Sequence, residues 1–172
     1  YQIVKSAGNS RNDGLNTSDG GYDLLVGAST AKNVLIVAAA NKVTNYTGPN
    51  SVSMSSFSSW VPTDDGRIKP DIAGAGVGIY SCSDGGSQAY TTMQGTSMSS
   101  PNVTGTLLLM QQLYSEVNNG EFMRASTLRG LAIHSAKEAG SNQGPDYEYG
   151  FGYLDAASAA NQILMKDQIT TG

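Results

Sequence analysis

A run of seven apolar residues, from Val34 to Ala40, most narrows the folds open to this chain of 172 residues. A strand with one face in water alternates apolar and polar residues, whereas a strand buried on both faces is apolar throughout. The run therefore predicts a strand over Asn33–Ala40 inside a mostly parallel sheet. It is far too short to cross a bilayer, which takes about 20 apolar residues. Shorter apolar segments predict three more strands, at Gln2–Ala7, Leu24–Ala28 and Ile72–Ile79.

Helical spacing replaces these strand patterns in the second half of the chain. A helix over Met98–Val117 is predicted because apolar residues there alternate between steps of four and three. These residues are Val103, Leu107, Met110, Tyr114 and Val117. Gly105 lowers the helix propensity, which indicates a close backbone contact at that point.

Two further helices follow. One is predicted to begin at Ser126 or Thr127 and to stop at Gly140, and the other begins after Asp155, whose carboxylate can cap it. Strands alternating with helices predict an α/β fold in which a parallel sheet is covered by helices.

Composition limits the size and the partners of this chain. Its length corresponds to about one domain, and a hydrophobic content of 39% is enough to form a core. A net charge of −4 without a basic run argues against nucleic acid or a membrane as the partner. The single cysteine, Cys82, excludes an internal disulfide. Because Tyr1 opens on what looks like the middle of a strand, we expect the chain to be part of a longer polypeptide.

The segment Gly95-Thr96-Ser97-Met98-Ser99-Ser100-Pro101 opens the predicted long helix. A serine at a helix start lies at the positive end of the helix dipole, among N–H groups without helical partners. Its plainest interpretation is a helix cap. A glycine before the serine and a buried helix after it also fit a catalytic nucleophile. The pattern is not Gly-x-Ser-x-Gly, because Ser99 stands at the position of the second glycine.

This segment closely resembles the nucleophile motif of the subtilisin-like serine proteases, or subtilases. Ser6-Ala7-Gly8-Asn9 resembles the strand end that carries the oxyanion-hole asparagine of this family. Other stretches agree in order along the chain: Phe57-Ser58-Ser59, Lys69-Pro70-Asp71-Ile72-Ala73 and Tyr149-Gly150-Phe151-Gly152-Tyr153-Leu154-Asp155-Ala156.

The resemblance implies a fold, an activity and a set of site residues. Residues 1–172 would be the C-terminal portion of a subtilase catalytic domain, part of a doubly wound, mostly parallel sheet without its N-terminal strands. The activity implied is that of a secreted serine endopeptidase acting on proteins or peptides. Ser97 would form the acyl-enzyme, and Asn9 and the Ser97 N–H would hold the oxyanion, with Thr96 in support. Asp71 matches a structural position of the family.

A protease of this family also needs a histidine base and an orienting aspartate, both earlier in the chain than the serine. The only histidine, His134, follows Ser97 and falls inside a predicted helix. The His-Gly-Thr-His motif of the family is absent from this sequence. The spacing Asp-x-Gly occurs only in glycine-containing loop segments, at Asp19-Gly20-Gly21, Asp64-Asp65-Gly66 and Asp84-Gly85-Gly86, and none of these resembles the segment that carries the aspartate of the family. We therefore expect an N-terminal portion of the same catalytic domain to supply both residues and to be a partner of this chain.

Two alternatives remain open at this point. The chain could belong to a pseudoprotease or binding module that keeps the serine motif, or to an esterase-like hydrolase that pairs Ser97 with His134. No cofactor is expected. Some members of the family bind calcium, but Asn41–Asn50 offers oxygens without a carboxylate, so a calcium site stays unassigned.

Overall fold

The computed structural model describes residues 1–14 and 24–169 of the chain. Along the sequence its strands, 3-10 turns and helices are β1 (Val4–Ser6), η2 (Gly27–Thr30), β2 (Leu35–Ala40), η3 (Pro49–Ser51), β3 (Ile72–Ala75), β4 (Ile79–Cys82), β5 (Tyr90–Met93), α1 (Thr96–Val117), α2 (Ala125–His134) and α3 (Ala156–Ile169). Within this part of the chain, no helix is both long and apolar enough to cross a membrane.

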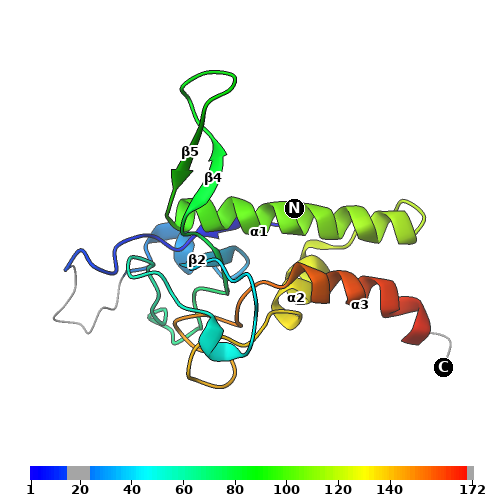
Figure 1. The fold of residues 1–172 in the computed structure, drawn as a ribbon. Helices are drawn as coiled ribbons and strands as arrows, with labels where there is room; N and C mark the ends of the chain where they lie inside the picture. Colours follow the sequence, from blue (N-terminus) through cyan, green and yellow to red (C-terminus); the bar gives the residue numbers. More distant parts are fainter. Residues whose placement is uncertain (15–23, 170–172) are drawn as a thin grey trace.

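A parallel sheet in the order β1-β2-β3 forms the centre of the molecule (Figure 1). Every residue of β2 is buried, as its apolar sequence predicts. Leu35 and Val37 face a core shared with α1, α2 and α3, whereas Ile36 and Ala38 pack against the loops on the opposite face. The predicted α/β fold, a parallel sheet with flanking helices, is therefore confirmed.

Two of the strand predictions need correction. Leu24–Ala28 does not form a strand: Leu24 and Leu25 are buried, and the chain then turns into η2 at Gly27, whose φ is +57°. The predicted strand Ile72–Ile79 is in fact β3 and the start of β4, separated by a turn in which Gly78 has a φ of +65°.

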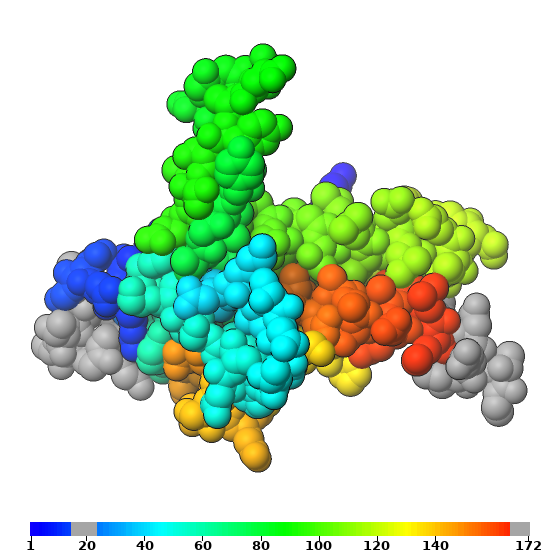
Figure 2. Space-filling view, in the orientation of Figure 1, coloured from blue at the N-terminus to red at the C-terminus, as the bar shows by residue number. Residues whose placement is uncertain are grey.

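The strands β4 and β5 form an antiparallel hairpin that the sequence analysis did not predict. The hairpin projects from the body of the molecule, just before α1 (Figures 1 and 2). Rings of Tyr80 and Tyr90 stack across it with centroids 5.4 Å apart. The overlooked signal is Asp84-Gly85-Gly86 between two short runs of strand-forming residues, a usual hairpin turn.

The helices match their predictions except at two ends. α1 begins at Thr96, two residues before the predicted start, and α2 begins at Ala125 but ends at His134, well before Gly140. Beyond His134 the chain leaves the helix because Lys137 and Tyr153 exchange two backbone hydrogen bonds of 2.8 Å. For α3 the prediction is confirmed.

Asp155 caps α3 as predicted: its Oδ1 accepts hydrogen bonds from the N–H groups of Ala157 (3.0 Å) and Ser158 (3.1 Å). The close contact expected at Gly105 is not found, since a Cβ built there would meet no described atom within 4 Å. α1 instead approaches the sheet at Gly74 and Gly76. A Cβ on Gly74 would lie 2.9 Å from Cγ2 of Val103 in α1, and a Cβ on Gly76 would lie 2.9 Å from the carbonyl oxygen of Gly95, the residue before α1.

A buried charge cluster fixes the entry to β3. Asp71 accepts hydrogen bonds from the Ile36 N–H (2.7 Å), from Lys69 Nζ (2.6 Å) and from the Arg129 guanidinium (2.7 Å). The side chains of Lys69 and Asp71 are each only 2% exposed. Because α2 and β2 both meet Asp71, this carboxylate joins layers of the fold, a structural role.

Candidate active site

Ser97 lies in the first turn of α1, at the edge of the sheet where the parallel strands end. Gly95 precedes this turn with a φ of +151°, and its N–H donates to the carbonyl of Gly76 (2.8 Å). The N–H of Gly76 donates in turn to the carbonyl of Ala40, the last residue of β2 (3.0 Å). These two hydrogen bonds place the start of α1 at the carboxyl ends of β2 and β3, where α/β folds carry their sites.

Asn9 reaches the same turn from the end of β1. Its Oδ1 accepts hydrogen bonds from the N–H and from the hydroxyl of Thr96, both 2.9 Å long. A backbone N–H can only donate, so the amide oxygen faces Thr96 and Nδ2 is turned away from it. Asn9 is exposed, and its Nδ2 makes no hydrogen bond to a described residue. The side chain thus offers a fixed and unused donor.

Thr96 connects the two segments from a position that water does not reach, since it is 1% exposed. Its hydroxyl donates to Asn9 and accepts a hydrogen bond from the N–H of Gly8 (3.2 Å). Both the amide and the backbone beside it are therefore tied to the first turn of α1.

The Ser97 N–H is a second unused donor. In the first turn of α1, the Thr96 N–H binds Asn9, and the N–H groups of Met98 and Ser99 bind the Gly95 carbonyl (3.0 and 3.3 Å). No hydrogen bond joins the Ser97 N–H to the described residues. This leaves one N–H at the positive end of the helix free for a ligand.

The missing side chain of Gly95 leaves a space between these donors. The point where its Cβ would stand lies 3.4 Å from Asn9 Nδ2 and 3.6 Å from the Ser97 nitrogen. The sulfur of Met98 is also 3.6 Å from this point. Two fixed N–H donors around one small space form an arrangement that stabilises negative charge developing on an oxygen.

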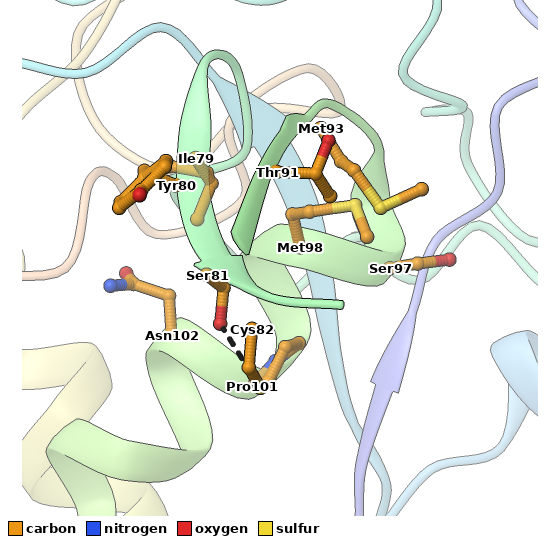
Figure 3. A pocket seen from close by; sticks show the side chains of 10 residues that line it. All are labelled: Ile79, Tyr80, Ser81, Cys82, Thr91, Met93, Ser97, Met98, Pro101 and Asn102. Carbon is orange, nitrogen blue, oxygen red and sulfur yellow. Dashed lines mark hydrogen bonds between the residues drawn. The ribbon is translucent and has the colours of Figure 1, made fainter. Parts of the chain in front are cut away.

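Ser97 itself is exposed and lines a pocket of 350 Å³ between the hairpin and the start of α1. Figure 3 shows Ser97 at the edge of this pocket, with the side chains of Met93 and Met98 next to it. The hairpin wall, including Met93, is the part of the site that the sequence analysis missed.

Among the described residues, no histidine or carboxylate that could take the Ser97 hydroxyl proton lies beside Ser97. His134 is exposed at the last position of α2 and is not part of the pocket wall. The pocket wall contains no carboxylate, and Asp71 is enclosed by its own partners. No group of three or more His, Cys, Asp or Glu side chains within residues 1–14 and 24–169 is arranged to hold a metal ion.

Comparison of the sequence with models of known protein families gives a match. The model described as the subtilase family, a group of S8 peptidases, matches residues 2–152. This chain belongs to the subtilase family. The match spans the Asn9 segment and the serine motif of α1, and it ends within the segment Tyr149–Ala156 that leads into α3.

Among curated proteins, this subtilase chain is 39% identical to the C5a peptidase of Streptococcus pyogenes over 105 residues, or 61% of the chain. It is 36% identical to the PII-type proteinase of Lactococcus lactis subsp. cremoris over 80 residues, or 46% of the chain. The matched parts make up 8% and 4% of those two proteins. The chain therefore spans a small part of the length of the relatives it matches.

Solved structures with the same architecture are also proteases. The CspB protease of Clostridium perfringens matches with a TM-score of 0.67 and 26% identity, over 81% of this chain and 29% of that one. The prenylagaramide maturation protease PagA matches with a TM-score of 0.66 over 94% of this chain and 50% of that one. At 21% identity, the second match speaks for the fold alone.

Proposed function

We propose that this chain carries the nucleophile and the oxyanion hole of a subtilisin-like serine endopeptidase. Ser97 is the nucleophile, the Asn9 amide and the Ser97 N–H are the oxyanion donors, and Thr96 holds the amide. The observation that carries the proposal is the pair of hydrogen bonds from Thr96 to Asn9 Oδ1, both 2.9 Å long. They leave Nδ2 unpaired beside the equally unpaired Ser97 N–H.

In the reaction, the Ser97 oxygen attacks the carbonyl carbon of a peptide bond while a base takes the hydroxyl proton. The carbonyl oxygen becomes negative in the tetrahedral intermediate and is stabilised by the two N–H donors. Loss of the amine, which receives the proton, leaves an acyl group on Ser97. Water then attacks this ester with the same base and releases the acid.

The base and its orienting aspartate are proposed to come from the N-terminal portion of the same catalytic domain. A face of α1 is open to receive it: Leu108 and Leu109 are 66% and 65% exposed. Gly105 lies on the same face, because residues three and four apart are neighbours on a helix. In Figure 2 the atoms of α1 form an uncovered surface beside the hairpin. Burying two leucines contributes about 1.5–3 kcal/mol each, which favours docking at this place.

Proteins or peptides are the proposed substrates, and the proposed location is outside the cell, as for a secreted protease. Nucleic acid and membranes are not proposed as partners, given the net charge of −4. The experiment uses the whole protein that contains this chain. It compares peptide hydrolysis and fluorophosphonate labelling for wild type, Ser97→Ala, Asn9→Ala and the control Ser100→Ala.

We expect Ser97→Ala to abolish both hydrolysis and labelling, and Ser100→Ala to keep them. Asn9→Ala should lower kcat by about 10²–10³-fold, the size known for an oxyanion donor of subtilisin itself, with KM little changed. A higher KM with unchanged kcat would refute the oxyanion role. A whole protein that is folded but neither labelled nor active would instead be the pseudoprotease or binding module.

A further inference from the structure

The segment that carries Asn9 is held on its far side by residues 57–60. The Ser59 N–H donates to the carbonyl of Gly8 (2.8 Å), and the Ser59 hydroxyl accepts from the N–H of Ser10 (3.1 Å). The Arg11 N–H donates to the Phe57 carbonyl (3.2 Å). The backbone is therefore anchored immediately before and after Asn9.

Arg11 adds a side-chain anchor to this segment. Its guanidinium carbon lies 3.4 Å from the centroid of the Trp60 ring, and its NH1 donates to the Trp60 carbonyl (3.1 Å). A cation on the face of an indole is attracted by the ring quadrupole, and the planar guanidinium can stack and donate at once. Partial burial lowers the pKa of Arg11, and the attraction of the Glu148 carboxylate opposes this shift. The side chain is therefore docked on the protein surface and does not move freely in water.

We propose that Arg11, docked on Trp60, is a positioning residue for the oxyanion amide of Asn9. Thr96 holds the oxygen of that amide from one side, and residues 57–60 hold its backbone from the other. If the Arg11 anchor is lost, the backbone beside Asn9 gains freedom and Nδ2 moves relative to the Ser97 N–H. Misplacement of a catalytic group by about 1 Å can cost 10²-fold in rate.

This inference rests on the proposed function, because it concerns the same two donors. The experiment uses the whole protein and compares Arg11→Ala, Arg11→Lys, Trp60→Phe and the control Arg67→Ala. Arg67 is a suitable control because its guanidinium also makes an ion pair, with Asp65 (2.9 Å), and a hydrogen bond to a backbone carbonyl, that of Thr30 (3.0 Å), but none to the segments that carry Asn9 and Ser97. Each variant is measured for kcat and KM with a peptide substrate and for its melting temperature. Arg11→Ala is also combined with Asn9→Ala.

We expect Arg11→Ala to lower kcat by about tenfold with KM unchanged, a smaller loss than the roughly 10²–10³-fold that follows removal of one oxyanion donor, because the donor is still present but less well held. Arg11→Lys, which keeps a cation over the ring, and Trp60→Phe, which keeps an aromatic face, should each recover most of the activity. In the Asn9→Ala background, Arg11→Ala should change kcat by less than about twofold, because it acts through the amide that is then absent.

Three results would overturn the inference. The first is an unchanged kcat in Arg11→Ala. The second is an equal loss with and without Asn9, which would indicate a general structural effect. The third is a change confined to KM, which would place Arg11 in substrate binding. These results differ from a failure of the proposed function, because there the wild type itself would show no Ser97-dependent hydrolysis, and the inference would fall with it.

Discussion

Thr96→Val tests the hydroxyl that joins the Asn9 segment to the start of α1, the two parts of the proposed oxyanion hole. Valine keeps the volume and the branched Cβ of threonine, so the packing around this 1%-exposed residue is retained. Two hydrogen bonds are lost, the one donated to Asn9 Oδ1 and the one accepted from the Gly8 N–H. The backbone N–H of Thr96 still holds the amide. The substitution therefore removes one of the two hydrogen bonds that hold the Asn9 amide and keeps the other.

The expected magnitude follows from these contacts. A lost intramolecular hydrogen bond costs about 0.5–1.5 kcal/mol, and a buried N–H left unpaired costs about 1–3 kcal/mol. Gly8 is only half-buried, so the lower part of the second range applies. We expect a loss of about 2 kcal/mol in the free energy of unfolding. We also expect a fall in kcat of about tenfold, smaller than for Asn9→Ala, which removes the donor altogether.

The assay is urea unfolding of the whole protein in a Ser97→Ala background, which prevents self-digestion, together with peptide hydrolysis in the Ser97 enzyme. Thr104→Val is the matched control. It lies on the same helix, is exposed and bonds only the Ser100 carbonyl (2.9 Å). Its effect should stay within about 0.5 kcal/mol. If Thr96→Val and Thr104→Val were indistinguishable in stability and in kcat, the Thr96 hydroxyl would not be holding the site.

Two further predictions concern oxidation and pH. Peroxide should inactivate the proposed enzyme, because the Met98 sulfur lies 3.6 Å from the point where a Cβ of Gly95 would stand, between the two proposed oxyanion donors, and its oxidation adds a polar oxygen there. Met98→Leu should resist peroxide and Met93→Leu should not. Activity that survived verified oxidation of Met98 would contradict the reasoning. Partial burial, followed by repulsion from Asp146, raises the pKa of Glu148 above its usual 4.5. The folded state therefore holds this proton more tightly, and stability falls as the pH rises through the raised pKa. Glu148→Gln in the Ser97→Ala background should accordingly be more stable than its parent at pH 7, with the difference shrinking at pH 4; an equal difference at both pH values would refute it.

The fold could be predicted where one physical signal acted alone. The continuous apolar run of β2 requires burial on both faces, and the spacing of Val103, Leu107 and Met110 requires a helix. The predictions that failed involve competition between local and distant contacts. α2 was expected to continue to Gly140, but backbone pairing of Lys137 with Tyr153 ends it early. No feature of the sequence near Lys137 indicates that its backbone pairs with Tyr153.

Two glycines show the same difference between a local signal in the sequence and a contact between distant residues. Gly105 is predicted to mark a close contact because it weakens a helix, yet a Cβ built on it would meet no described atom within 4 Å. The tight approach is at Gly76, where the hydrogen bonds to Gly95 and Ala40 bring the start of α1 against the sheet. A glycine that lowers helix propensity is visible in the sequence. A glycine that admits a neighbouring backbone becomes recognisable only when that neighbour is known.

The position of the candidate site could be predicted from the serine motif. Which hydrogen-bond donors the site presents could not, because that depends on the orientation of the Asn9 amide. Every helix begins with N–H groups that lack helical partners. In α1 the N–H of Thr96 binds the Asn9 oxygen, and those of Met98 and Ser99 bind the Gly95 carbonyl. Only the Ser97 N–H is left without a partner in this set, and the bond to Thr96 turns the Asn9 donor outward beside it. In an ordinary helix cap, a side-chain oxygen accepts hydrogen bonds from the free N–H groups at the helix start and no donor is left over. Here the same hydrogen bonds leave two donors unpaired next to an exposed hydroxyl, which favours a site for developing negative charge over a helix cap.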